Sequence, residues 1–179
     1  MQLIHAPQTE ARTLSSPIMD DPQQVLAEHW PMLSRIAASF AHDLVHRQDL
    51  LQDISIAVWH ALPRWRGEGS QRAFVARVAH NRAIDVLARE QRLPTASLEE
   101  ALPDPLADPV RQAESDQQRQ ALLIAVRRLP LGYRQVVSLS LEGFSQREIA
   151  QVLGMEENAV AQRLSRARRQ LRDWMGATR

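Results

Sequence analysis

The stretch GFSQREIAQVLGMEENAVAQRLSRARRQL, residues 143–171, carries the signals of two helices joined by a tight turn. Ser145 and Glu148 form the S-x-x-E pattern of a capping box, which begins a helix. Gly154 can supply the turn, because glycine adopts the left-handed backbone conformation that ends many helices. We therefore expect a helix-turn-helix motif in this part of the chain.

The second helix of this motif has two different sides. Four apolar residues recur at i, i+4, i+7 and i+11, which predicts a buried stripe: Val160, Leu164, Ala167 and Leu171. The other side is polar and basic, as expected of a helix that enters the major groove of DNA. The residues predicted to contact duplex DNA are Asn158, Gln162, Arg163, Ser165, Arg166 and Arg169. The alternative is an arginine-rich helix that only packs and stays soluble, but the capped helix and the glycine before it favour DNA contact.

Composition limits the remaining possibilities. The chain has 179 residues, room for one ordinary domain or two small ones, and 44% of them are hydrophobic. It has no cysteine, which excludes disulfides and thiolate metal sites. No signal peptide pattern or membrane-spanning apolar run is present, so we expect a cytoplasmic protein.

The order of helical and irregular segments predicts an all-α fold. It consists of two small helical domains joined by a flexible acidic linker, with the helix-turn-helix in the C-terminal domain. Residues 93–110 contain four prolines and four acids, which suit a linker and not a core. The predicted segments are a flexible tail at 1–22, a first domain at 23–92, the linker at 93–112 and a second domain at 113–179.

Hydrophobic periodicity predicts the helices and their inner faces. In the first domain, helices are expected from about residue 23, from Arg47 to Leu62, and from Gln71 to Gln91 after a Ser70 cap. Their predicted inward residues are Val25, Leu26, Trp30, Leu33, Ile36, Ala37 and Phe40; Leu51, Ile54, Val58 and Leu62; and Phe74, Val78, Ile84 and Leu87. In the second domain, helices are expected at about 110–128 and 133–141, before the opening motif.

Two surfaces of the first domain carry further signals. The helix that follows Arg47 has an acidic face with one apolar residue, at i, i+3, i+4 and i+7: Asp49, Gln52, Asp53 and Ile56. This face suits a basic partner, although a plain solvated face is the alternative. The next loop and helix interleave arginines with Trp65 and Phe74, a pattern that suits single-stranded nucleic acid. The alternative is that both aromatic residues belong to the core.

Taken together, these segments resemble the extracytoplasmic-function (ECF) sigma factors of the sigma-70 family. DLLQDISIAVWHALPRW, residues 49–65, is similar to the polymerase-binding helix of that family. SQRAFVARVAHNRAIDVLARE, residues 70–90, resembles its promoter-melting helix, and residues 129–171 resemble its fourth region. The resemblance covers three motifs in the order that the family has them.

The resemblance implies partners and roles for the residues named above. Asp49, Gln52, Asp53 and Ile56 would bind the β′ clamp helices of core RNA polymerase. The residues implied to recognise the melted minus-ten element are Trp65, Arg66, Arg77, Asn81, Arg82 and Asp85. The helix at 157–172 would read the minus-thirty-five element, and its domain would contact the β flap. An anti-sigma factor is the expected regulator. The alternative function is a helix-turn-helix regulator that binds DNA without polymerase.

Histidines offer the one hint of other chemistry. His42 and His46 stand one helical turn apart in an H-D-x-x-H pattern, a spacing that could hold a metal. A metal-dependent hydrolase would need a third ligand and a base, and the sequence identifies neither. We therefore predict no enzyme activity, no metal and no cofactor, and take these residues as polar groups at a helix end.

Overall fold

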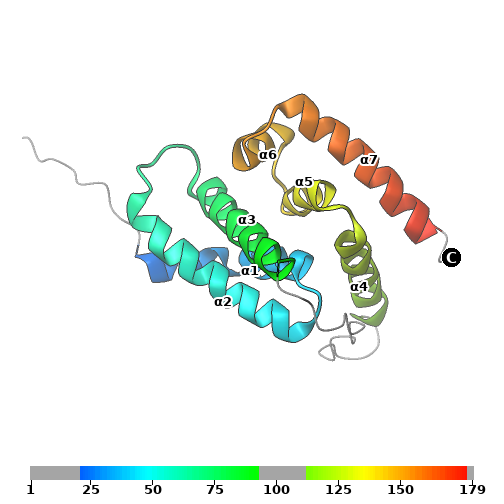
Figure 1. Ribbon diagram of the computed structural model, residues 1–179, viewed down its shortest axis with the longest axis horizontal. Helices are drawn as coiled ribbons and strands as arrows, with labels where there is room; N and C mark the ends of the chain where they lie inside the picture. The colour runs from blue at the N-terminus through cyan, green and yellow to red at the C-terminus, as the bar shows by residue number, and fades with distance from the viewer. Residues whose placement is uncertain (1–20, 93–111, 177–179) are drawn as a thin grey trace, which may run out of the picture.

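The computed structural model describes residues 21–92 and 112–176, and within these ranges the chain forms seven α-helices, one 3₁₀ turn and no strand (Figure 1). The helices are α1 Pro22–Phe40, α2 Leu44–Ala61, α3 Gln71–Glu90, α4 Gln112–Arg128, α5 Leu131–Leu141, α6 Gln146–Leu153 and α7 Glu157–Gly176, with the 3₁₀ turn at Leu62–Arg64. The predicted tail and linker lie outside the described residues, except where α1 and α4 begin. None of the described helices is both long and apolar enough to cross a membrane.

Helices α1, α2 and α3 form the first helix group. Side-chain caps begin all three: Asp21 accepts from the backbone N–H of Gln23 at 3.0 Å, Asp43 caps α2, and Ser70 caps α3 as predicted. Because Asp43 accepts from the backbone N–H of His46 at 2.7 Å, α2 begins three residues before the predicted start at Arg47.

The inner faces of this group differ in part from the prediction. Trp30, expected inside, is 48% exposed. Phe74, Val78, Ile84 and Leu87 of α3 are only partly buried at the edge of the core. The buried face of α3 is made instead of Val75, Ala76, Ala79, His80 and Ala83. These side chains are mostly small, which lets α1 and α2 approach the α3 backbone closely.

Helices α4 to α7 form the second helix group, which contains the helix-turn-helix. The capping box is present: Ser145 Oγ accepts from the backbone N–H of Glu148 at 3.3 Å, and the Glu148 carboxylate accepts from the backbone N–H of Ser145 at 2.8 Å. Gly154 ends α6 in the left-handed conformation, with φ at 63°. The four predicted inward residues of α7 are all buried. The local sequence thus sets the geometry of this motif.

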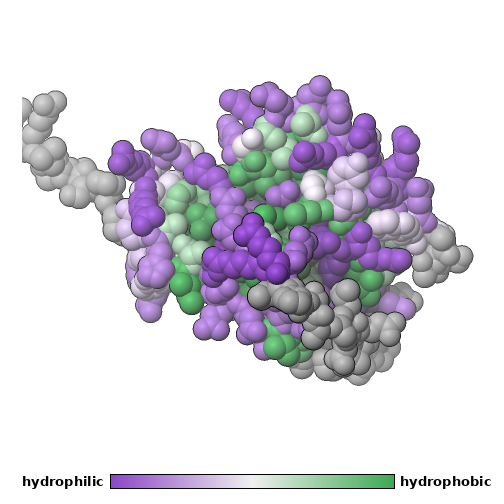
Figure 2. Space-filling view, viewed as in Figure 1, coloured by the Kyte–Doolittle hydropathy of each residue, from purple (hydrophilic) through white to green (hydrophobic). Residues whose placement is uncertain are grey.

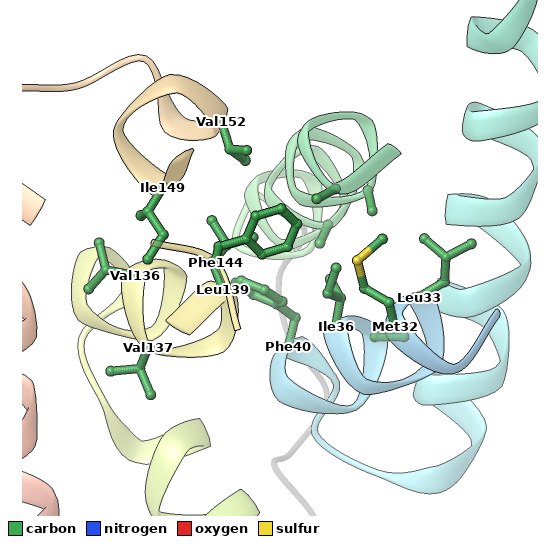
Figure 3. Close-up of a cluster of buried hydrophobic side chains, with 14 of the residues drawn as sticks. Met32, Leu33, Ile36, Phe40, Val136, Val137, Leu139, Phe144, Ile149 and Val152 are labelled. Atoms are coloured by element: carbon green, nitrogen blue, oxygen red, sulfur yellow. The ribbon is translucent and has the colours of Figure 1, made fainter. Parts of the chain in front are cut away.

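The two helix groups pack against each other, which the sequence did not predict. Figure 3 shows Met32, Ile36 and Phe40 of α1 on one side, Leu139 of α5 and Val152 of α6 on the other, and Phe144 between them. Helix α3 also contacts α6, and α1 contacts α4. We call these contacts the intramolecular interface.

Polar groups complete the intramolecular interface. The Arg35 guanidinium donates two hydrogen bonds to the Glu142 carboxylate, each 2.7 Å long. His80 Nε2 lies 3.3 Å from Ser138 Oγ, and the buried imidazole meets Phe40 edge-on at 5.3 Å. Burial lowers the pKa of His80 to about 3, so the ring is neutral at this interface.

Candidate nucleic-acid interface

The outer face of α7 presents five of its six predicted DNA-contacting residues to solvent: Asn158, Gln162, Ser165, Arg166 and Arg169. Hydrophilic side chains cover the outer edge of this helix (Figure 2). Arg163 is different, because it is half-buried and turned toward the helix-turn-helix itself. One of its guanidinium nitrogens lies 3.7 Å from Met155 Sδ, and the group packs beside Gly132 of α5.

The helix before α7 is fixed by electrostatics as well as by shape. Hydrogen bonds from Ser145 lower the pKa of the Glu148 carboxyl, which therefore stays ionised at neutral pH. Together with the Gly154 turn, this cap holds α6 at a fixed angle to α7. The geometry is that of a helix-turn-helix whose second helix is free to enter a groove.

The surface of α3 carries a second polar line. Arg77, Asn81 and Asp85 are exposed at i, i+4 and i+8, which places them on one side of the helix. Near its N-terminal end, the Trp65 and Phe74 rings lie 6.4 Å apart, and the Arg77 guanidinium lies 5.8 Å from the Phe74 ring. Both rings are half-buried, so they belong partly to the core and partly to the surface.

One ion pair joins the two surfaces predicted for the first domain. Arg82 of α3 lies 2.9 Å from the Asp53 carboxylate of α2, and both side chains are half-buried. The other members of the α2 face, Asp49, Gln52 and Ile56, are exposed. The predicted polymerase-binding and minus-ten-binding residues therefore meet at Asp53 and Arg82.

Sequence reasoning missed a tryptophan beside the acidic face. Trp59 follows Ile56 by three residues on α2, and the two side chains are 41% and 48% exposed. Exposed large apolar residues next to charged ones are typical of protein-binding surfaces. The signal was present in the i, i+3 spacing, but a tryptophan in a helix is usually assigned to the core.

The beginning of α3 lies against the helix-turn-helix. A groove of about 370 Å³ separates them, lined on one side by Phe74 and Arg77 and on the other by Glu148 and Val152. Arg72, five residues before Arg77, stacks on the Phe144 ring at 4.3 Å and donates to the backbone carbonyl of Glu142. The intramolecular interface therefore narrows access to this end of α3.

A second, larger groove of about 1120 Å³ lies between α4 and the C-terminal half of α7. Its apolar lining includes Ile124 and Trp174, and Arg128 stacks on the Trp174 ring at 5.5 Å. A partly apolar groove rimmed by arginines can accept a protein segment with acidic and apolar residues.

The histidine pair lies at the start of α2. The His42 and His46 rings are 4.1 Å apart, and His46 Nε2 lies 2.9 Å from a carboxylate oxygen of Glu90, the last residue of α3. Burial lowers the pKa of His46. Glu90 is a neighbour that the sequence did not identify, because it is distant along the chain.

Two protein families match this chain, one in each helix group. "Sigma-70 region 2" matches residues 25–93, and "Sigma-70, region 4" matches residues 117–171. We use the names region 2 and region 4 for these two parts of the chain. Both matches agree with the resemblance that the motifs indicated.

Whole-chain comparisons find relatives with the same two regions. The ECF RNA polymerase sigma factor SigM of Mycobacterium tuberculosis is 30% identical over 154 residues, which span 86% of this chain and 76% of SigM. The structure of CnrH in complex with the cytosolic domain of CnrY is 28% identical, with a TM-score of 0.63 over 87% of this chain and 88% of CnrH. RpoE in complex with the anti-sigma factor NepR from Bartonella quintana is 20% identical with a TM-score of 0.71, covering 88% of this chain and 98% of RpoE, and shows the shared fold.

Proposed function

This chain belongs to the ECF RNA polymerase sigma factors, and we propose that it converts core RNA polymerase into a holoenzyme that opens a specific set of promoters. The observation that carries the proposal is that regions 2 and 4 stand in order on one chain and each exposes a polar face. Sigma factors are initiation factors, and the polymerase performs the chemistry. The proposed function requires contact with chromosomal DNA, so we propose the cytoplasm as its location.

The proposed division of the chain follows the sequence. Residues 23–92 act as the polymerase-binding and promoter-melting domain, and residues 113–179 act as the duplex-reading domain. Residues 93–112 link them, and residues 1–22 form a tail. The helix groups at 22–90 and 112–176 support this division.

For polymerase binding, we propose the α2 face of Asp49, Gln52, Asp53 and Ile56 as the contact with the β′ clamp helices. The exposure of Asp49, Gln52 and Ile56 supports this role, and the exposed Trp59 adds apolar area to the face. The groove between α4 and α7 is the proposed contact of region 4 with the β flap, since its apolar floor is open to solvent.

For melted minus-ten DNA, we propose Trp65, Arg66, Arg77, Asn81, Arg82 and Asp85. The stack of Trp65, Phe74 and Arg77 supports this role, because unpaired bases stack on aromatic rings and cations attract phosphates. Arg82 would contact DNA only after it exchanges its ion pair with Asp53.

For the minus-thirty-five duplex, we propose α7. Asn158 and Gln162 suit base edges, Arg166 suits a guanine or a phosphate, and Ser165 and Arg169 suit the backbone. Arg163 is proposed to stabilise the helix-turn-helix through Met155 as well as to approach DNA.

The proposed function requires the two regions to separate. Their promoter elements are named for positions about 25 base pairs apart, which is about 85 Å of duplex at 3.4 Å per base pair. In this structure Arg72 of region 2 stacks on Phe144 of region 4 at 4.3 Å. We propose that this arrangement is a closed state and that binding to polymerase and promoter opens it. An anti-sigma factor is the regulator that we propose for this chain, and the complexes of CnrH with CnrY and of RpoE with the anti-sigma factor NepR support such a partner.

Reconstitution with core polymerase tests the function. The purified chain should form a stable holoenzyme and support run-off transcription from a subset of genomic promoters. Asp49→Arg should weaken holoenzyme formation. Glu28→Arg makes the same reversal of charge at an exposed acid on α1 and should not weaken it. If the chain binds duplex DNA but no polymerase, it is a helix-turn-helix regulator instead.

A further inference from the structure

Three side chains with metal-binding atoms come together where α2 begins and α3 ends. One ligand atom each from His42, His46 and Glu90 lies within 4.8 Å of the other two. His42 precedes α2, His46 is in its first turn, and Glu90 is the last residue of α3. The fold therefore adds to the H-D-x-x-H pattern the third ligand that the sequence could not supply.

His46 is the fixed member of this cluster. Its side chain is only 10% exposed, and its Nε2 atom lies 2.9 Å from the Glu90 carboxylate. Although the distance would allow a hydrogen bond, the direction does not, and this buried nitrogen has no hydrogen-bond partner. A buried ring nitrogen without a hydrogen bond is unfavourable unless another group satisfies it. A cation bound to this nitrogen and to the neighbouring carboxylate would satisfy it.

An imidazole nitrogen beside a carboxylate oxygen, here 2.9 Å apart, is a donor pair that transition metals use.

His42 and Glu90 are the adjustable members. Their side chains are 52% and 43% exposed, so both can move without disturbing the core. Around tetrahedral zinc, ligand atoms stand about 3.4 Å apart, given metal–ligand distances of about 2.1 Å. Closing the cluster from 4.8 Å to that spacing requires shifts of about 1 Å in two exposed side chains.

Asp43 contacts both histidines of the cluster. One of its carboxylate oxygens caps α2 through the backbone N–H of His46 at 2.7 Å. The other lies 3.2 Å from His42 Nε2. A carboxylate beside one imidazole nitrogen can orient the ring and leave the other nitrogen for a metal.

We propose that His42, His46 and Glu90 form a binding site for one divalent transition metal of the zinc class, with a fourth position open to water. Two imidazoles and one carboxylate match the donors of zinc and disfavour calcium or magnesium, which take oxygen ligands. If His46 binds the metal through Nε2, its proton must lie on Nδ1. The 3.3 Å hydrogen bond that Nδ1 accepts from the His42 backbone N–H would then be lost, and the metal bond would take its place in holding the ring. The metal would tie the start of α2 to the end of α3.

Zinc binding to the full chain, prepared without a histidine tag and stripped with chelator, tests the proposal. Calorimetry should detect one zinc ion per chain, and thermal unfolding should shift upward by about 5–10 °C at a free zinc concentration 100-fold above Kd. His42→Ala and Glu90→Gln should each weaken zinc binding by 10-fold or more, and should reduce the thermal shift at the same zinc concentration to about half or less. Both positions are exposed, so these variants should fold, as circular dichroism will check.

His60→Ala is the matched control, because His60 is an exposed histidine near the other end of α2. It should keep wild-type zinc affinity and the thermal shift. Cobalt(II) in place of zinc should give the strong visible absorption of a four-coordinate site, lost in His42→Ala. The proposal is overturned if the wild-type chain binds no stoichiometric zinc, or if His42→Ala and Glu90→Gln bind it with unchanged affinity. These readouts are independent of transcription.

Discussion

Region 4 presents its proposed DNA-reading face on a single helix, whereas region 2 distributes its polar residues over two helices that contact one another. On α7, side chains such as Asn158 and Arg166 reach into solvent. In region 2, Asp53 and Arg82 form an ion pair at 2.9 Å, and Arg72 is held by the intramolecular interface. Region 4 is thus ready for its proposed ligand as it stands, while region 2 must exchange contacts first.

The two regions also share one hydrophobic core, and the largest predicted effect tests how closely they are coupled. Ile54 in region 2 and Ile149 in region 4 are both fully buried. Ile54→Ala and Ile149→Ala should each lower the free energy of unfolding by about 2–5 kcal/mol, through lost burial and a cavity. Urea unfolding followed by circular dichroism should show a single transition for both. Two separate transitions in either variant would show that the regions fold independently.

The next effect concerns the exposed face of region 4. Arg166→Ala should weaken binding to a minus-thirty-five duplex by about 1–3 kcal/mol, roughly 5-fold to 150-fold, because the arginine is free to contact DNA. Fluorescence anisotropy at physiological salt measures the affinity. Arg89→Ala, at an exposed arginine in the last turn of α3, is the control and should bind the duplex normally. Equal affinity of Arg166→Ala and the wild-type chain would remove Arg166 from the interface.

The pH dependence of unfolding tests the contact between His80 of region 2 and Ser138 of region 4. The pKa of His80 is about 3 in the folded chain and near 6.5 when unfolded. Between these two pKa values, the unfolded chain binds a proton at His80 that the folded chain does not. The contribution of neutral His80 to the free energy of unfolding is therefore fully present above pH 6.5 and is lost as the pH falls toward 3. From pH 7 to pH 5.5 the loss should be about 1 kcal/mol.

His80→Leu should remove this part of the pH dependence, as measured by urea unfolding at both pH values. Ser138 keeps a hydrogen-bond acceptor in the variant, because its hydroxyl also donates to the Gln135 carbonyl at 3.2 Å. A wild-type slope that persists in His80→Leu would mean that other groups carry the pH dependence.

The smallest effect compares the helix caps of the two regions. Ser145 and Ser70 both cap a helix, but the Glu148 side chain also bonds back to Ser145, whereas for Ser70 the cap is the hydrogen bond that its hydroxyl accepts from the backbone N–H of Ala73. Serine-to-alanine changes at caps cost about 0.5–2 kcal/mol, and Ser145→Ala should lie toward the upper end. Thermal unfolding of both variants gives the comparison. A larger loss in Ser70→Ala would show that the capping box adds nothing here.

Local chemistry explains what could be predicted from the sequence. The Ser145 cap, the Gly154 turn and the buried stripe of α7 depend on residues within a few positions of each other, and all three are present. The inner face of α3 could not be assigned correctly, because its alanines give a weak hydrophobic signal and its larger residues, such as Phe74, lie at the edge. Pairings over long sequence distances, such as Arg35 with Glu142 and His46 with Glu90, leave no periodic pattern.

The intramolecular interface weakens the apparent affinity of any partner that requires the two regions to be apart. Because both regions belong to one chain, they meet at an effective concentration on the order of millimolar, so even a contact too weak to join two separate molecules can keep them together. If about one molecule in a hundred is open, a partner that requires the open form binds about a hundredfold less tightly than its contacts allow. Under the proposed opening, residues that hold the two regions together, such as Arg35 and Glu142, would raise the polymerase concentration needed for transcription.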